Sequence, residues 1–145
     1  MRLVLDTNIV VAALLWAGPP RRLLDRAIDD EAITLYRTPV LLDELAHTLQ
    51  YPKLAPRVDL LGTTAAALTA QYAALVTLVS PTQVPRVIER DADDDHVIAA
   101  AVAARAELIV TGDRRHLLPI GTHQGIAIVT AAEALNRIAA QTSTD

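Results

Sequence analysis

The sequence predicts one α/β domain over residues 1–145 with a mostly parallel sheet, and three observations lead to this prediction. Two apolar runs, residues 3–5 and 108–110, are uninterrupted, as in strands buried on both faces of a parallel sheet. Segments with helical periodicity alternate with these runs along the chain. A length of 145 residues suits one domain, and no linker or repeat divides it.

The expected elements follow from periodicity and from helix-start signals such as Thr38-Pro39, a capping hydroxyl before a proline at the first helical position. Strands are expected at residues 3–5, 33–36, 78–79, 108–111 and 126–129. Helices are expected at residues 9–17, 21–32, 39–50, 59–75, 97–104 (opened by the acidic run before it), 114–118 and 131–140. Loops are expected at residues 51–58 and 82–90, and a frayed end at 141–145.

Composition excludes several classes of protein. Hydrophobic residues make up 52% of the chain, but there is no phenylalanine, so the core must be built from leucine, valine, isoleucine and alanine. The absence of cysteine excludes disulfides, thiolate metal sites and cysteine nucleophiles. The apolar run at residues 97–104 is too short to cross a bilayer and no signal peptide is visible, so we expect a cytoplasmic protein without a membrane partner.

Two aspartates follow the predicted buried strands. Asp6 ends the first strand, and Asp113 follows the strand at 108–111 after a glycine. Because the carboxyl ends of parallel strands meet at one edge of a sheet, these carboxylates can converge where α/β proteins place ligands. For Asp6 alone, capping of the next helix is an equally good interpretation.

A third acid lies on the helix predicted at residues 39–50. On a helical wheel Glu44 flanks the apolar stripe, whereas Asp43 and His47 fall on the far side, toward water. Glu44 can therefore point into a cleft at the sheet edge. Considered alone, it also fits an ordinary surface carboxylate.

The densest acidic stretch has four aspartates in five consecutive positions at the start of an apolar helix. Capping explains one or two of them, but the mutual repulsion of four favours a bound cation. Asp95 shares a helix face with Ala99, Val102 and Ala106 and is expected to point inward. Asp94 projects on the same side as Arg105 and is expected to be solvated, and Asp93 is interpreted as a cap that can support the site.

Four carboxylates buried together are untenable at neutral pH without a partner, and the set proposed is Asp6, Glu44, Asp95 and Asp113. The oxygen-preferring ions Mg²⁺ or Mn²⁺ resolve this conflict, and such a site hydrolyses phosphate esters. Asn8 and Thr111 are placed to orient the carboxylates, although cap or turn chemistry explains them equally well. The histidines lack metal-ligand spacing, and each is expected at the surface or in packing: His47, His96, His116 and His123.

These residues stand in segments that resemble PIN domains, in the branch of toxins from toxin–antitoxin systems. The matching segments are LVLDTNIVVAALLW, TPVLLDELAHTL, DADDDHVIAAAVAARAELIVTGD and GIAIVTAAEAL. The resemblance implies a three-layer α/β/α sandwich and a metal-dependent ribonuclease acting on single-stranded RNA, with the same four acids as its quartet. It also implies a homodimer and a cognate antitoxin that blocks the site. Ala92 departs from the branch, which often has proline there.

Net charge does not decide the partner. The formal charge is −4, but if four acids hold a metal the remaining acids and bases balance. Arginines that flank the acidic motifs are candidates for phosphate contacts, or plain surface charge: Arg86, Arg90, Arg114 and Arg115. Two other functions stay open. A phosphatase could use Asp6 as nucleophile, although Asn8 stands where that class needs an acid, and a non-catalytic binding module would use the acids only as caps.

Overall fold

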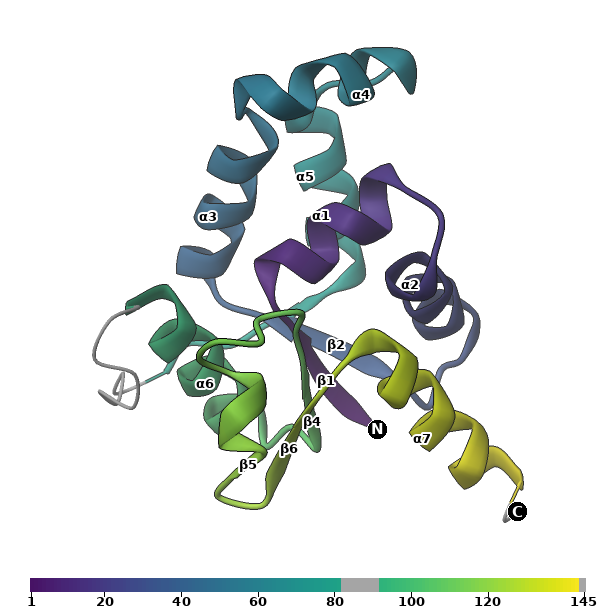
Figure 1. The fold of residues 1–145 in the computed structure, drawn as a ribbon, viewed down its shortest axis with the longest axis vertical. Coiled ribbons are helices and arrows are strands. Elements are labelled where there is room, and N and C mark those ends of the chain that lie inside the picture. The colour runs from purple at the N-terminus through teal and green to yellow at the C-terminus, as the bar shows by residue number, and fades with distance from the viewer. Residues whose placement is uncertain (82–91, 144–145) are drawn as a thin grey trace.

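The two apolar runs become the central strands of a six-stranded sheet in the computed structural model, which describes residues 1–81 and 92–143 (Figure 1). The sheet order is β3-β2-β1-β4-β6-β5. The strands span β1 (Arg2–Leu5), β2 (Thr34–Arg37), β3 (Thr77–Leu78), β4 (Leu108–Val110), β5 (Thr122–His123) and β6 (Ile126–Val129). The strands β1 to β4 and β6 pair in parallel and only the β5–β6 pair is antiparallel, which confirms a mostly parallel sheet.

Helices cover both faces of this sheet, as expected for a three-layer α/β/α sandwich (Figure 1). The helices are α1 (Thr7–Leu15), α2 (Pro19–Asp29), α3 (Pro39–Leu49), α4 (Ala55–Leu60), α5 (Ala65–Leu75), α6 (Ala92–Ala104) and α7 (Ala131–Ser143). On one face α1 packs against α2 and α3, and α2 packs against α7, whereas α6 covers β1 and β4 on the opposite face.

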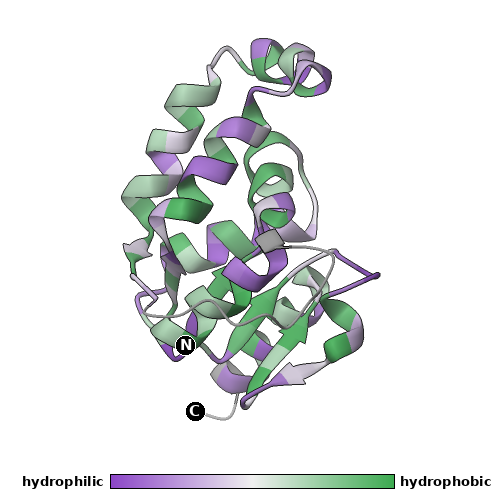
Figure 2. Cartoon of the chain, turned by 90° about the vertical axis from the view of Figure 1, so that its left-hand side faces the viewer, coloured by the Kyte–Doolittle hydropathy of each residue, from purple (hydrophilic) through white to green (hydrophobic). Residues whose placement is uncertain are grey.

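Side chains alternate between two cores along the central strands. Leu3 and Leu5 join the core beneath α1, α2 and α7, whereas Val4 joins the core beneath α6. Ile109, which pairs with Val4 on the neighbouring strand β4, joins the same core as Val4. All of these side chains are fully buried. Figure 2 shows the strands at the centre of the sheet mainly in the green of hydrophobic residues. Burial on both faces accounts for the unbroken apolar runs of the sequence.

The structure differs from the prediction at several connections. The segment expected as a loop at residues 51–58 is instead a 3₁₀ helix, Pro52–Leu54, followed directly by α4, which extends to Leu60. The helix expected at residues 59–75 therefore begins only at Ala65 as α5, because the chain turns at Gly62 (φ +68°) and Thr64 then caps α5 by accepting a hydrogen bond from the Ala67 amide.

The helix expected at residues 114–118 is a turn followed by a 3₁₀ helix at Leu118–Ile120. The end of the chain was expected to fray from residue 141, but α7 extends to Ser143, and the loop expected at residues 82–90 lies outside the described residues.

The hairpin of β5 and β6 was not predicted. Its tip is Gln124-Gly125, and both residues have positive φ (51° and 80°), as a two-residue hairpin turn requires. Among the helices of the described part of the chain, none has the length and apolar character needed to cross a membrane.

Candidate active site

A cavity of about 340 Å³ opens at the carboxyl edge of the sheet, where β1 and β4 end. It is lined by residues from the start of α1, from α3 and α6, and from the turn after β4. These residues are Asp6, Thr7, Asn8, Glu44, Asp94, Gly112, Asp113, Arg115 and His116. The position agrees with the rule that ligands bind beyond the carboxyl ends of parallel strands.

Asp6 is both a helix cap and a wall of this cavity. It is the N-cap of α1, and its Oδ1 accepts a hydrogen bond from the Thr7 amide at 2.8 Å. Its Oδ2 accepts a hydrogen bond from the Thr111 hydroxyl, also at 2.8 Å. Burial raises the pKa of Asp6 above its usual value although these hydrogen bonds and the charge of Arg37 oppose the rise. The anion is therefore held in position but incompletely stabilised.

Thr111 connects the ends of the two central strands. Its buried hydroxyl donates to Asp6 at the end of β1 and accepts a hydrogen bond from the Asp113 amide at 3.0 Å. A single side chain thus orients one carboxylate directly and the loop that carries another.

Glu44 reaches the cavity from α3, and Thr7 holds it there. The Thr7 hydroxyl donates to Glu44 Oε2 at 3.0 Å. Glu44 is half-buried, whereas its neighbour Asp43 is exposed, as the helical wheel predicted. The carboxylate that flanks the apolar stripe is therefore the one that lines the cavity.

Beneath these two acids lies Arg37, which sequence reasoning missed. Its side chain is fully buried, and its guanidinium donates to the Thr7 hydroxyl at 2.6 Å, to the carbonyl of Leu41 at 3.1 Å and to the carbonyl of Leu5. It also lies over the Tyr72 ring, 5.8 Å from the ring centroid. Burial lowers the pKa of Arg37, against the opposing effects of Tyr72, Glu44 and Asp6. The site thus contains an internal cation.

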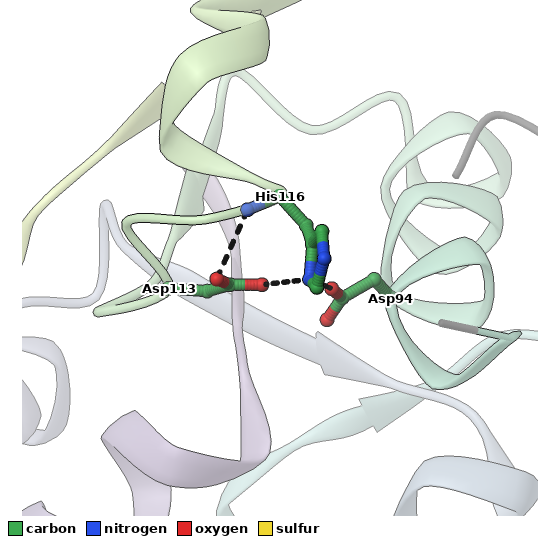
Figure 3. Close-up of side chains that lie close together, drawn as sticks. All are labelled: Asp94, Asp113 and His116. Carbon is green, nitrogen blue, oxygen red and sulfur yellow. Dashed lines mark hydrogen bonds and ion pairs between the residues drawn. The ribbon is translucent and has the colours of Figure 1, made fainter. Parts of the chain in front are cut away.

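A second group of side chains closes the opposite wall (Figure 3). Asp113 Oδ1 accepts hydrogen bonds from the amides of Arg115 at 2.9 Å and His116 at 3.1 Å. The imidazole Nδ1 of His116 lies 3.5 Å from Asp113 Oδ2 and 3.8 Å from Asp94 Oδ2. Burial raises the pKa of Asp113, but hydrogen bonds with Asp94 and with the two amides, together with the charge of His116, outweigh it, so that the pKa is lowered.

The prediction that Asp94 is solvated was wrong. Asp94 is 6% exposed and lines the cavity. The helical wheel placed Asp94 toward solvent because it projects on the same side as Arg105. However, α6 ends at Ala104 and Arg105 has a left-handed backbone (φ 52°), so the direction of Arg105 says nothing about the faces of α6. Of the three residues used to place Asp95 inward, Ala99 and Ala106 are buried, whereas Val102 is 38% exposed.

Asp95 is buried beside Asp94, at 2% exposure, but it is not among the residues that line the cavity. Its assignment to the acidic quartet therefore stays a prediction, and the structure brings Asp94 together with Asp6, Glu44 and Asp113 instead. The side chain of Asp93 lies outside what the structure describes.

The remaining predicted residues are divided between rim and surface. Asn8 is exposed and lines the cavity, as does Arg115, whereas Arg114 is exposed outside the lining set. Arg86 and Arg90 lie outside the described residues. His116, expected only at the surface or in packing, is part of the cavity wall.

Comparison with known proteins assigns the family. A model of the PIN domain matches residues 2–115. The protein MJ1680 of Methanocaldococcus jannaschii, itself described as uncharacterized, is 31% identical over 115 residues, which are 79% of this chain and 72% of that protein. A crystal structure of VapBC2 from Rickettsia felis, bound to a DNA fragment from its promoter, has the same fold, with a TM-score of 0.58 at 13% identity over 88% of this chain and 97% of that one. The chain belongs to the PIN domain family.

Proposed function

We propose that this protein is a Mg²⁺- or Mn²⁺-dependent endoribonuclease that cuts single-stranded RNA and serves as the toxin of a toxin–antitoxin pair. PIN domains are generally nucleases. The observation that carries the proposal is the convergence of four carboxylates, those of Asp6, Glu44, Asp94 and Asp113, on one cavity at the carboxyl edge of the sheet.

The chemistry of these donors fits a hard divalent ion. Carboxylate oxygens are the ligands that Mg²⁺ and Mn²⁺ prefer. Burial raises the pKa of Asp6, so a cation would relieve the cost of keeping this group ionised. Asp94 and Asp113 offer oxygen atoms within 4.8 Å of each other. When bound, such an ion supplies positive charge for the scissile phosphate and makes water easier to deprotonate.

The residues around the acids provide orientation. Thr111 and the Thr7 amide fix both oxygens of Asp6, and the Thr7 hydroxyl fixes Glu44. At the rim, Arg115 can pair with a phosphate of the substrate, and the exposed amide of Asn8 can hydrogen-bond to a phosphate or a ribose. Arg86, Arg90 and Arg114 stay candidates for phosphate contacts through their nearness in sequence.

The choice of single-stranded RNA rests on the resemblance to PIN-domain toxins, and the recessed site supports it. Asp6 is only 6% exposed, so the scissile phosphate must enter the cavity to approach it. A flexible single strand can bend its backbone into such a recess more easily than a stiff duplex can.

The proposed partners are an antitoxin and a second copy of this chain. The fold is shared with VapBC2, a complex crystallised with promoter DNA, which supports the antitoxin. Large apolar side chains stay exposed on the segment around α4, namely Tyr51, Leu60 and Leu61, and such exposure is typical of protein interfaces. We place this activity in the cytoplasm, where RNA substrates are abundant.

The deciding experiment offers the purified protein an end-labelled single-stranded RNA, the matching duplex and a small phosphomonoester, with Mn²⁺ and then with EDTA. We expect internal cuts in the single strand that EDTA abolishes. A matched pair on α3 provides the control, since Glu44→Gln should lose cleavage while Asp43→Asn, at the exposed neighbour, should keep it. Release of phosphate from the small ester alone would identify a phosphatase, and failure to bind Mn²⁺ would indicate a binding module.

A further inference from the structure

The imidazole of His116 is held between two carboxylates without forming a hydrogen bond of normal length to either. Its Nδ1 lies 3.5 Å from Asp113 Oδ2 and 3.8 Å from Asp94 Oδ2 (Figure 3). Hydrogen bonds from nitrogen to oxygen are about 2.7–3.2 Å long. The nitrogen is therefore too far from each oxygen for a good direct contact, yet close to both.

These separations resemble those of ligands around one shared ion. Donor atoms about 2.0–2.3 Å from a metal lie roughly 3 Å apart when adjacent and no more than about 4.6 Å apart when opposite. The donor atoms of Asp94, Asp113 and His116 all lie within 4.8 Å of one another. A small movement of the side chains would allow all three to contact the same cation.

The backbone presents His116 in this position. Its amide donates to Asp113 Oδ1 at 3.1 Å, and the Leu118 amide donates to the Asp113 carbonyl at 2.9 Å, so the turn after β4 folds back on Asp113. Leu117 is fully buried in the core under α6 and anchors the turn. The imidazole is only 35% exposed and faces the cavity.

We propose that His116 is a nitrogen ligand of the divalent ion held by Asp94 and Asp113, and that it makes this site favour Mn²⁺ over Mg²⁺; the inference rests on the metal dependence proposed above. Both ions prefer oxygen donors, but Mg²⁺ demands a near-ideal octahedron and gives up its waters reluctantly, whereas the transition ion Mn²⁺ accepts an imidazole nitrogen beside carboxylates more readily. The competing interpretation is that a protonated His116 only forms an ion pair with the two carboxylates. In that case its nitrogen never contacts the metal.

Pulsed electron paramagnetic resonance of the Mn²⁺-loaded protein separates these interpretations, because a nitrogen bound to Mn²⁺ produces a ¹⁴N coupling. We expect the coupling in the wild-type protein, its replacement by a ¹⁵N coupling when only the histidines carry ¹⁵N, and its loss in His116→Gln. His47→Gln, at an exposed histidine on α3, is the matched control and should keep the coupling.

Calorimetry on the same proteins tests the selectivity. Loss of a group that only supports a ligand weakens metal binding by about 10- to 100-fold, so in His116→Gln, which loses a ligand, we expect Mn²⁺ to bind at least about 10-fold more weakly and Mg²⁺ affinity to change by less than about threefold. Circular dichroism establishes that both variants are folded. Wild-type protein that binds Mn²⁺ without ¹⁴N coupling, or His116→Gln that retains the coupling, overturns the role of His116 alone. Wild-type protein that binds no Mn²⁺ overturns the proposed function as well.

Discussion

The two walls of the cavity balance their negative charge in different ways. The β1 wall, which we define as Asp6, Thr7, Arg37 and Glu44, holds its acids by hydrogen bonds of normal length and contains a fully buried guanidinium. The β4 wall, which we define as Asp94, Asp113 and His116, has no buried guanidinium. It has a partly exposed imidazole instead, whose Nδ1 lies 3.5 Å from Asp113 Oδ2 and 3.8 Å from Asp94 Oδ2. The β1 wall thus carries a cation of its own, which does not fully offset the burial of Asp6, whereas we expect an added ion to bridge the acids of the β4 wall.

This difference assigns separate tasks to the two walls. Arg37 links the end of β1, the first turn of α1 and α3 through three acceptors, and its charge faces Asp6 and Glu44. The β1 wall is thus part of the folded core. The acids of the β4 wall lie on separate elements, α6 and the loop after β4, so an ion between them would fix one relative to the other.

We expect the largest effect from removing the internal cation. Arg37→Met should lower the free energy of unfolding by about 3–5 kcal/mol, because it removes three hydrogen bonds to buried acceptors and leaves two carboxylates without a counter-charge. Urea denaturation in EDTA measures the change. Arg105→Met, at an exposed arginine, should change stability by less than about 0.5 kcal/mol. A loss below about 1 kcal/mol for Arg37→Met would show that the β1 wall does not need this charge.

The next effect concerns the neighbouring aspartates of α6. Asp94→Asn should reduce metal-dependent RNA cleavage by at least about 100-fold, because the carboxylate lines the cavity and a lost transition-state contact has about this cost. Asp95→Asn should reduce it by less than about fivefold. Cleavage rates at saturating Mn²⁺ measure both, with melting temperatures to confirm folding. If Asp95→Asn reduced cleavage more than Asp94→Asn, Asp95 and not Asp94 would be the acid of α6 that acts in the quartet.

The contrast between the walls also shows what the sequence could predict. Asp6 was found because a strand buried on both faces and a helix start have clear local patterns, and Glu44 because α3 has a well-defined apolar stripe. The phase of α6 was misjudged because six of its thirteen residues are alanine, so its faces differ little in polarity. Only tertiary packing distinguishes Asp94 from Asp95 there.

Arg37 and His116 were missed for different physical reasons. Arg37 shares a face of β2 with Leu35, and a charged residue on the buried face of an apolar strand was the available signal, but the strand was expected to end at Tyr36. His116 lies close to two acids in the structure. One is Asp113, three residues before it in the sequence, and the other is Asp94, on a different element. Spacing along the chain therefore could not identify the second pair.

A smaller effect is expected where the two walls join. Thr111→Val keeps the shape of the side chain but removes the hydroxyl that donates to Asp6 and accepts from the Asp113 amide. We expect Mn²⁺ to bind about 10-fold more weakly and the free energy of unfolding to fall by about 1–3 kcal/mol. Thr69→Val on α5, distant from the cavity, should leave the metal affinity unchanged. Unchanged calorimetry for Thr111→Val would mean that the walls act independently.

The smallest effect is a difference in how the two walls respond to pH without metal. In the folded protein the pKa of Asp6 is raised above 3.8, so at pH values just above 3.8 the folded protein binds more protons than the unfolded chain. The free energy of unfolding should therefore fall as pH rises through this window. The pKa of Asp113 is lowered below 3.8, so its stabilising contribution is present above 3.8 and is lost as pH falls through the lower window.

Two variants separate these opposite slopes. Urea denaturation in EDTA at closely spaced pH values gives the free energy of unfolding, and one proton corresponds to a slope of at most about 1.4 kcal/mol per pH unit. Asp6→Asn should remove the falling slope above pH 3.8 and leave the rising slope below it, whereas Asp113→Asn should do the opposite. If Asp6→Asn left the falling slope intact, burial of Asp6 would not be its source. The β1 wall would then hold its carboxylate without cost, and the distinction between the two walls would rest on Arg37 alone.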